Sequence, residues 1–159
     1  YSSALKYFLK SLDMQLKIYG DSPHPDIAAS YNNIGNVYQS QSDYSLALDC
    51  HRKSLNMRLE IYGDSPHPDI SRSYNNIGLV HQSKGDYSSA LAWLRRGLAA
   101  LPPGQSPDRT TISRYIQETE ETIKKLVIHM VRAPQILTIQ SQSHSPTMDH
   151  QLGLWYWKS

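Results

Sequence analysis

The chain has 159 residues, with 16 Lys and Arg against 14 Asp and Glu, which leaves a formal net charge of +2. Hydrophobic residues make up 39% of it and charged residues 19%, a balance too apolar for a wholly disordered chain and too polar for a membrane protein. No apolar run approaches the roughly 18 residues that span a bilayer. The single cysteine, Cys50, excludes an internal disulfide framework and an all-cysteine zinc site. The near-neutral charge gives no electrostatic reason to expect nucleic acid as a partner.

The start of the sequence bears on what kind of chain this is. Tyr1 rather than a methionine comes first, and no signal peptide precedes the body of the chain. We therefore expect a fragment of a longer cytoplasmic protein that does not enter the membrane.

An internal repeat of 43 residues organises the sequence. Residues 18–44 read IYGDSPHPDIAASYNNIGNVYQSQSDY and residues 61–87 read IYGDSPHPDISRSYNNIGLVHQSKGDY, with 21 of these 27 positions identical. The offset continues upstream, where residues 1–5 match residues 44–48. Self-similarity at a fixed period is typical of repeat architectures. We expect the chain to begin inside one repeat, to complete a second and to run through a third.

Each repeat predicts two helices, so the chain is expected to be all-α. The GDSPHP stretch holds two prolines and a glycine and is read as a loop, with Pro25 at the first helical position. One face of the first helix then shows spacings of four, three and four, in Ile27, Tyr31, Ile34 and Tyr38.

Two further features recur in both copies. A glycine, Gly35 and then Gly78, falls in the middle of the first helix, where it costs about 1 kcal/mol relative to alanine. We expect a neighbouring helix to approach closely there. Asp43 and Asp86 stand where the second helix begins and suit its N-cap.

These patterns resemble the tetratricopeptide repeat, whose signature combines an aromatic residue, a Leu-Gly pair, a tyrosine and an alanine. The elongated period, the HPD tripeptide and the YNNIG run resemble the kinesin-light-chain type of that repeat. The resemblance implies a right-handed superhelical solenoid of helical hairpins with a C-terminal capping helix. It assigns structural roles to Tyr31, Ile34, Gly35, Tyr38, Ala47, Tyr74, Ile77, Gly78 and Ala90, with His81 in place of the second tyrosine.

Five segments follow along the chain. We expect the second helix of a truncated repeat over 1–20, tetratricopeptide repeats over 21–63 and 64–104, a capping helix over 105–132 and a disordered tail over 133–159. The capping helix is predicted because this segment has charged residues on most faces and one apolar stripe, whose members are Ile112, Ile116, Thr119, Ile123, Leu126 and Met130. A coiled-coil segment is the alternative for this stripe. In the tail, the GLWYW cluster either docks on the array or a partner, or has no function.

Asparagines are the sharpest candidates for a binding site. Consecutive asparagines are unfavourable within a helix, and here they lie off the apolar face of the first helix of each repeat. In the resembled family this helix lines a concave groove, and the asparagine before the Leu-Gly pair binds peptide backbone, which a carboxamide suits because it is both donor and acceptor. The groove residues implied here are Asn33, Asn76, Asn36, Gln39, Arg72, Leu79 and Gln82. Alternatively, the asparagines hydrogen-bond between adjacent helices and only hold the superhelix together.

No catalytic, metal or cofactor motif accompanies the repeats. Cys50 and His51 are neighbours about 100° apart on a helix, and no two histidines have the i, i+4 spacing of a helical zinc site. Neither a P-loop nor a dinucleotide fingerprint is present. HPD is also the J-domain tripeptide, but here it recurs with the repeat and opens a helix each time, so we read it as a turn and helix start. We expect a protein that is not an enzyme and takes no cofactor or metal.

The sequence therefore predicts an interaction protein with a protein or peptide ligand. The first hypothesis is a scaffold or adaptor that holds an extended peptide, in the resemblance a kinesin-light-chain-like cargo adaptor. The alternative is the sensor array of a larger nucleotide-binding signalling protein. A third option is self-association through exposed repeat ends. We expect no nucleic acid and no membrane among the partners.

Overall fold

The computed structural model describes the backbone of residues 2–20, 22–63, 65–104, 106–142, 147–149 and 154–156, and side chains within residues 3–131 apart from 21, 64 and 105. The chain divides into two compact units, Tyr1–Glu120 and Glu121–Ser159. The repeats lie in the first unit.

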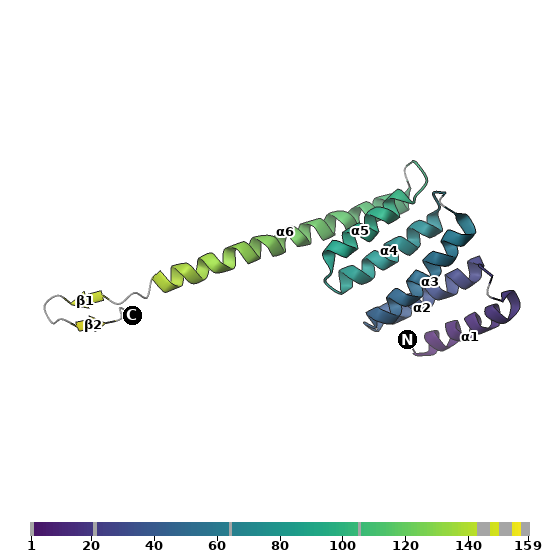
Figure 1. The fold of residues 1–159 in the computed structure, drawn as a ribbon, viewed down its shortest axis with the longest axis horizontal. Coiled ribbons are helices and arrows are strands. Elements are labelled where there is room, and N and C mark those ends of the chain that lie inside the picture. Colours follow the sequence, from purple (N-terminus) through teal and green to yellow (C-terminus); the bar gives the residue numbers. More distant parts are fainter. Residues whose placement is uncertain are drawn as a thin grey trace. The chain divides into compact units, whose positions relative to one another are not determined.

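Successive helices build the first unit (Figure 1). In chain order they are α1 (Ser2–Tyr19), α2 (Pro25–Ser40), α3 (Tyr44–Tyr62), α4 (Pro68–Ser83), α5 (Tyr87–Ala99) and the start of α6 (Pro107–Gln142). α2 packs against α3 and α4 packs against α5, so each repeat forms one helical hairpin, and α3 packs against α4 to join the two. The result is the all-α solenoid of hairpins that the repeat pattern predicts.

The HPD tripeptide acts as a helix start. His24 is the N-cap of α2, where its Nδ1 accepts a hydrogen bond from the backbone N–H of Asp26 at 3.2 Å, and Pro25 occupies the first turn. The His24 ring also stacks on Tyr19 with 3.6 Å between centroids. His67 repeats both contacts at 3.1 Å and 3.6 Å. The reading of HPD as a turn and helix start is thus confirmed.

The N-cap prediction for the second helices is confirmed in one copy. Asp86 accepts a hydrogen bond from the backbone N–H of Ser89 at 3.2 Å, and its carboxylate also lies 3.1 Å from Nδ1 of His81. The Ser89 hydrogen bonds, followed by the His81 imidazole, lower the pKa of Asp86. Asp43 occupies the N-cap position of α3, yet its side chain makes no capping hydrogen bond. At the position equivalent to His81, the first repeat has Tyr38 instead of a histidine.

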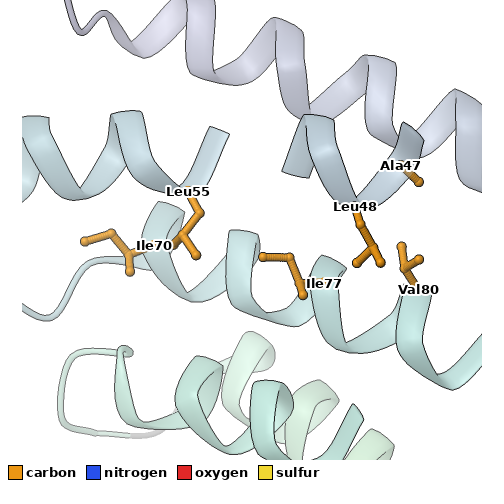
Figure 2. Close-up of a cluster of buried hydrophobic side chains, with 6 residues drawn as sticks. All are labelled: Ala47, Leu48, Leu55, Ile70, Ile77 and Val80. Carbon is orange, nitrogen blue, oxygen red and sulfur yellow. The ribbon is translucent and has the colours of Figure 1, made fainter. Parts of the chain in front are cut away.

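The apolar core runs between the hairpins. Ala47, Leu48 and Leu55 project from α3 and meet α4 (Figure 2). The α4 side chains that complete this cluster are Ile70, Ile77 and Val80, each at most 3% exposed. A second cluster of Leu12, Ile27, Ile34 and Cys50 lies towards α1, and a third of Leu94, Leu101 and Ile112 lies towards α6. Burial of one apolar face per helix therefore continues from hairpin to hairpin.

The mid-helix glycines lie where a second helix crosses, which is the close approach expected of them. A Cβ at Gly35 would come within 2.7 Å of the His51 ring of α3, and a Cβ at Gly78 within 2.9 Å of Leu94 of α5. Both distances are too short for any side chain, so glycine permits the hairpin to close despite its low helix propensity.

A buried cation joins the two repeats. Arg58 on α3 is 4% exposed, and its Nη1 donates to the backbone oxygen of Asp69 and to Oγ of Ser73, both at 2.8 Å. Burial lowers the pKa of the Arg58 guanidinium. One repeat earlier, Gln15 stands at the same position and accepts from Oγ of Ser30 at 2.7 Å. Equivalent residues thus bridge both junctions.

The first part of α6 covers the end of the array. Ile112 and Thr119 are 3% and 0% exposed, and Ile112 packs with Leu94 of α5. Arg95 of α5 donates to Glu120 at 2.8 Å. This is the capping arrangement that the apolar stripe predicts, as far as Glu120.

Beyond Glu120 the second unit differs from expectation. Leu126 and Met130, the last members of the predicted stripe, are 47% and 72% exposed. α6 continues past the predicted end at residue 132 to Gln142.

Two short strands also lie within the segment expected to be a disordered tail. β1 (Thr147–Asp149) and β2 (Leu154–Tyr156) pair antiparallel, with Met148 opposite Trp155. The rest of that segment after Gln142 lies outside the described residues.

Candidate functional site

The candidate groove residues lie on α2 and α4, the first helices of the two repeats. Asn33 and Asn36 are exposed on α2, and Arg72 is exposed on α4. The remaining members, Gln39, Asn76, Leu79 and Gln82, are half-buried. The two helices therefore present a mainly polar, uncharged surface.

Two contacts between carboxamides and their neighbours bridge α2 and α4. Nδ2 of Asn76 donates to Oδ1 of Asn32 at 2.7 Å, and Asn32 is only 7% exposed. Nε2 of Gln39 donates to Oγ of Ser83 at 3.4 Å. Asn76 contributes one amide hydrogen to this bond, and the side-chain carbonyl oxygen of Asn76 takes no part in it.

Asn75 is a residue that the sequence argument did not single out. It occupies the position of Asn32 one repeat later, and its Oδ1 is buried without a hydrogen-bond partner in the described part of the chain. It lines a cavity of about 60 Å³ between α4 and α6, together with Pro68, Ser71, Arg72, Asp108, Thr111 and Ile112. A buried carbonyl oxygen of this kind is an unused acceptor. The 43-residue offset could have revealed it, since α6 carries no asparagine to repeat the Asn76 bond.

A neighbouring aspartate pairs with the positive charge of Arg72 in the groove. Nη1 of Arg72 lies 3.0 Å from Oδ1 of Asp69, one helical turn earlier. Exposed pairs of this sort are weak, so Arg72 remains able to exchange Asp69 for another carboxylate.

Signature residues of the repeat lie between the helices. Ile34, Gly35, Ala47, Ile77, Gly78 and Ala90 are buried, and Tyr31, Tyr38 and Tyr74 are half-buried beside them. Tyr74 stacks on Trp93 of α5 with 5.8 Å between ring centroids. These residues position the groove helices but do not form its surface.

The described residues contain no cluster of three or more His, Cys, Asp or Glu side chains that could hold a metal ion. Among them, too, no helix has the length and hydropathy needed to cross a bilayer. Cys50, whose pKa is raised by burial, packs in the core with Ile27 and Ile34.

Stacked hairpins of nearly identical sequence, with a polar face on their first helices, define a helical-repeat scaffold for protein–protein interaction. A family model described as tetratricopeptide repeat matches residues 1–60 and 26–102. The chain belongs to the tetratricopeptide repeat family.

Solved structures agree on the fold. A kinesin light chain from P. anserina with nearly identical TPR-like repeats is 16% identical, with a TM-score of 0.67 over 91% of this chain and 69% of that one. BtubC (BKLC) from P. vanneervenii is 17% identical, with a TM-score of 0.68 over 98% of this chain and 63% of that one. The TPR2AB domain of yeast Sti1, solved in a complex with pHSP90, is 16% identical, with a TM-score of 0.59 over 80% of this chain and 48% of that one. A sequence search of the curated proteins finds no match.

Proposed function

We propose that the chain is a non-catalytic adaptor that holds an extended peptide segment of a partner protein against α2 and α4. The observation that carries the proposal is the pair of exposed carboxamides, Asn33 and Asn36, beside the bonded Asn32–Asn76 pair. A carboxamide is donor and acceptor at once, so it can bind a peptide main chain of any sequence. Arg72 adds a charge suited to a carboxylate of the ligand.

We assign two different roles to the asparagines of α2 and α4. Asn32 and Asn76 hold α2 to α4, which is the inter-helix role that the sequence left open for them. Asn33 and Asn36 make no such contact in the described part of the chain and are available to a ligand. Asn76 contributes its remaining carbonyl oxygen. The complex of Sti1 TPR2AB with pHSP90 supports a protein ligand for a fold of this kind.

Two cellular settings fit such a module. In a kinesin-light-chain-like cargo adaptor it would join a cargo peptide to a motor, and in a signalling protein it would be the sensor array beside a nucleotide-binding domain. In a full-length transcript, heptads ahead of Tyr1 would favour the first setting and a P-loop would favour the second. We place both proteins in the cytoplasm. We also place the boundaries of the repeats at residues 20, 63 and 104.

A screen against a random library of extended peptides tests the groove. Asn33→Ala/Asn36→Ala is expected to abolish binding without changing helicity or thermal stability, because both side chains are exposed. The matched control, Ser45→Ala/Ser88→Ala, alters exposed polar residues on α3 and α5 and is expected to bind as the parent does. Peptide binding that is unchanged in Asn33→Ala/Asn36→Ala would refute the proposal.

Self-association is the second candidate, and exposed apolar side chains favour it. Tyr7, Met14 and Ile18 of α1 are 73%, 53% and 70% exposed. A solution mass that rises with concentration and falls back in Ile18→Lys would support it. A monomer mass at every concentration would exclude it.

A further inference from the structure

Basic residues are concentrated on the second helices of the repeats. α1, α3 and α5 together hold eight Lys and Arg against three Asp and Glu. The rest of the chain holds the other eight basic residues against eleven acidic ones. A chain of near-neutral net charge therefore carries a positive layer and a negative remainder.

Five of these cations occupy two equivalent positions of the repeat. Lys10, Lys53 and Arg96 follow one another at intervals of 43 residues, and Arg52 and Arg95 do the same one position earlier. All five are exposed. Because equivalent residues lie on equivalent faces of successive repeats, they form a row across α1, α3 and α5, which we name the cationic row.

Aromatic rings hold two members of the row in place. Nζ of Lys53 lies 5.7 Å from the ring centroid of Tyr31, and Cζ of Arg96 lies 4.9 Å from that of Trp93. A cation over a ring face is attracted to the ring without having its charge neutralised. The side chains are thereby positioned at less entropic cost to an incoming ligand.

Internal carboxylates neutralise only part of the row. Lys53 pairs with Asp49 at 2.9 Å and Arg95 pairs with Glu120 at 2.8 Å. Within the described residues, no carboxylate lies within ion-pair distance of Lys10, Arg52 or Arg96. One such cation therefore remains on each of the three helices.

We propose that the cationic row is a second docking surface, separate from the α2–α4 groove, and that its ligand is a carboxylate-rich segment of a partner protein. None of the five cations belongs to the groove. Asp49 and Glu60 lie among them on α3 and would repel a polymer of continuous negative charge, such as nucleic acid or an anionic bilayer. A peptide can instead place separate carboxylates at separate cations and leave neutral residues opposite the acids.

Fluorescence anisotropy of a labelled peptide whose glutamates are separated by Gly-Ser pairs, the spaced-glutamate peptide, titrated with the full chain at low salt, tests the proposal. Lys10→Gln/Arg52→Gln/Arg96→Gln is expected to weaken binding about tenfold, since exposed ion pairs contribute little singly but add over three sites. Raising the salt from about 20 mM to about 200 mM should weaken the parent as well, because the Debye length shortens.

The matched control is Lys84→Gln/Arg114→Gln/Lys125→Gln, which removes the same charge from exposed positions outside the row. It should bind within about twofold of the parent, because a specific surface depends on location and not on net charge. Equal weakening by both triple variants would overturn the proposal, as would absence of binding of the spaced-glutamate peptide at low salt. Tighter binding to duplex RNA or phosphatidylserine vesicles, lost in the row variant, would replace the acidic peptide as the ligand.

Asn33→Ala/Asn36→Ala distinguishes this surface from the groove. Binding of the spaced-glutamate peptide that survives this double variant but not the row variant supports the cationic row whatever the groove binds. Binding lost in the double variant would assign the peptide to the groove and overturn the row.

Discussion

The α2–α3 and α4–α5 hairpins are two versions of one design with different interiors. In the first, Oγ of Ser54 on the second helix donates to the backbone oxygen of Ala28 at 2.7 Å. In the second, glycine stands at the Ser54 position, and Oγ of Ser71 on the first helix donates to the backbone oxygen of Gly97 at 2.7 Å. One buried hydroxyl joins each pair of helices, but it is supplied from opposite sides.

The crossing point shows a larger contrast. His51 and Leu94 occupy the same position above Gly35 and Gly78, and both are fully buried. Neither ring nitrogen of His51 has a hydrogen-bond partner among the described residues, whereas Leu94 has no polar side-chain atom to satisfy. The glycine and the backbone set the distance between the helices, so the crossing side chain can change its chemistry as long as it fills the space.

The largest effect is expected where the hairpins are most alike. Ile34→Ala and Ile77→Ala should each lower the free energy of unfolding by about 2–5 kcal/mol, because both side chains are at most 2% exposed. Urea unfolding followed by circular dichroism measures this, and an unchanged midpoint would refute the helix-face assignment. Costs that differ strongly between the two variants would break the equivalence of the hairpins.

Acidification should distinguish the hairpins next. Burial, followed by the Arg58 guanidinium, lowers the pKa of His51 from 6.5 to about 4. Above pH 6.5 the imidazole is neutral in both the folded and the unfolded chain, so the titration of His51 costs no folding free energy there. As pH falls towards 4 the unfolded chain binds a proton that the folded chain refuses, which costs about 3 kcal/mol. Urea midpoints across this range should fall more steeply for the parent than for His51→Leu. Parallel pH profiles would contradict the assignment.

At pH 7 the same substitution should stabilise. His51→Leu copies the second hairpin and removes two unpartnered buried nitrogens, so we expect a gain of about 1–3 kcal/mol. Leu94→His is the reciprocal variant and should lose a similar amount. The melting temperatures of the pair measure both changes, and a destabilised His51→Leu would mean that the ring shape, and not its polarity, decides the contact.

The smallest effect concerns the exchanged hydroxyls. Ser54→Ala and Ser71→Ala each remove a single donor to a buried carbonyl, and each should cost about 1–2 kcal/mol. Thermal unfolding provides the comparison. A loss confined to one hairpin would show that the two bonds are not equivalent despite their equal length.

The period, the helix starts and the crossing points are all predictable from the amino-acid sequence. HPD predicts a turn followed by a helix because the fixed φ of proline is a local property. The imidazole caps of His24 and His67 were found only in the structure. A glycine in the middle of an apolar helix face similarly indicates a close neighbour, whatever that neighbour is. The helix starts and the crossing points depend on residues within about one helical turn of each other, and the 43-residue period appears when the sequence is aligned with itself.

Which of the repeated residues contact one another depends on how the helices stack. Asn32 and Asn33 are adjacent and chemically identical, and only the stacking of α4 on α2 selects Asn32 as the acceptor for Asn76. The orphaned oxygen of Asn75 likewise follows from what α6 places opposite it. Helical periodicity assigns a residue to a face, but a hydrogen bond between repeats requires an alignment to within a few tenths of an ångström, which comes from the packing of whole helices.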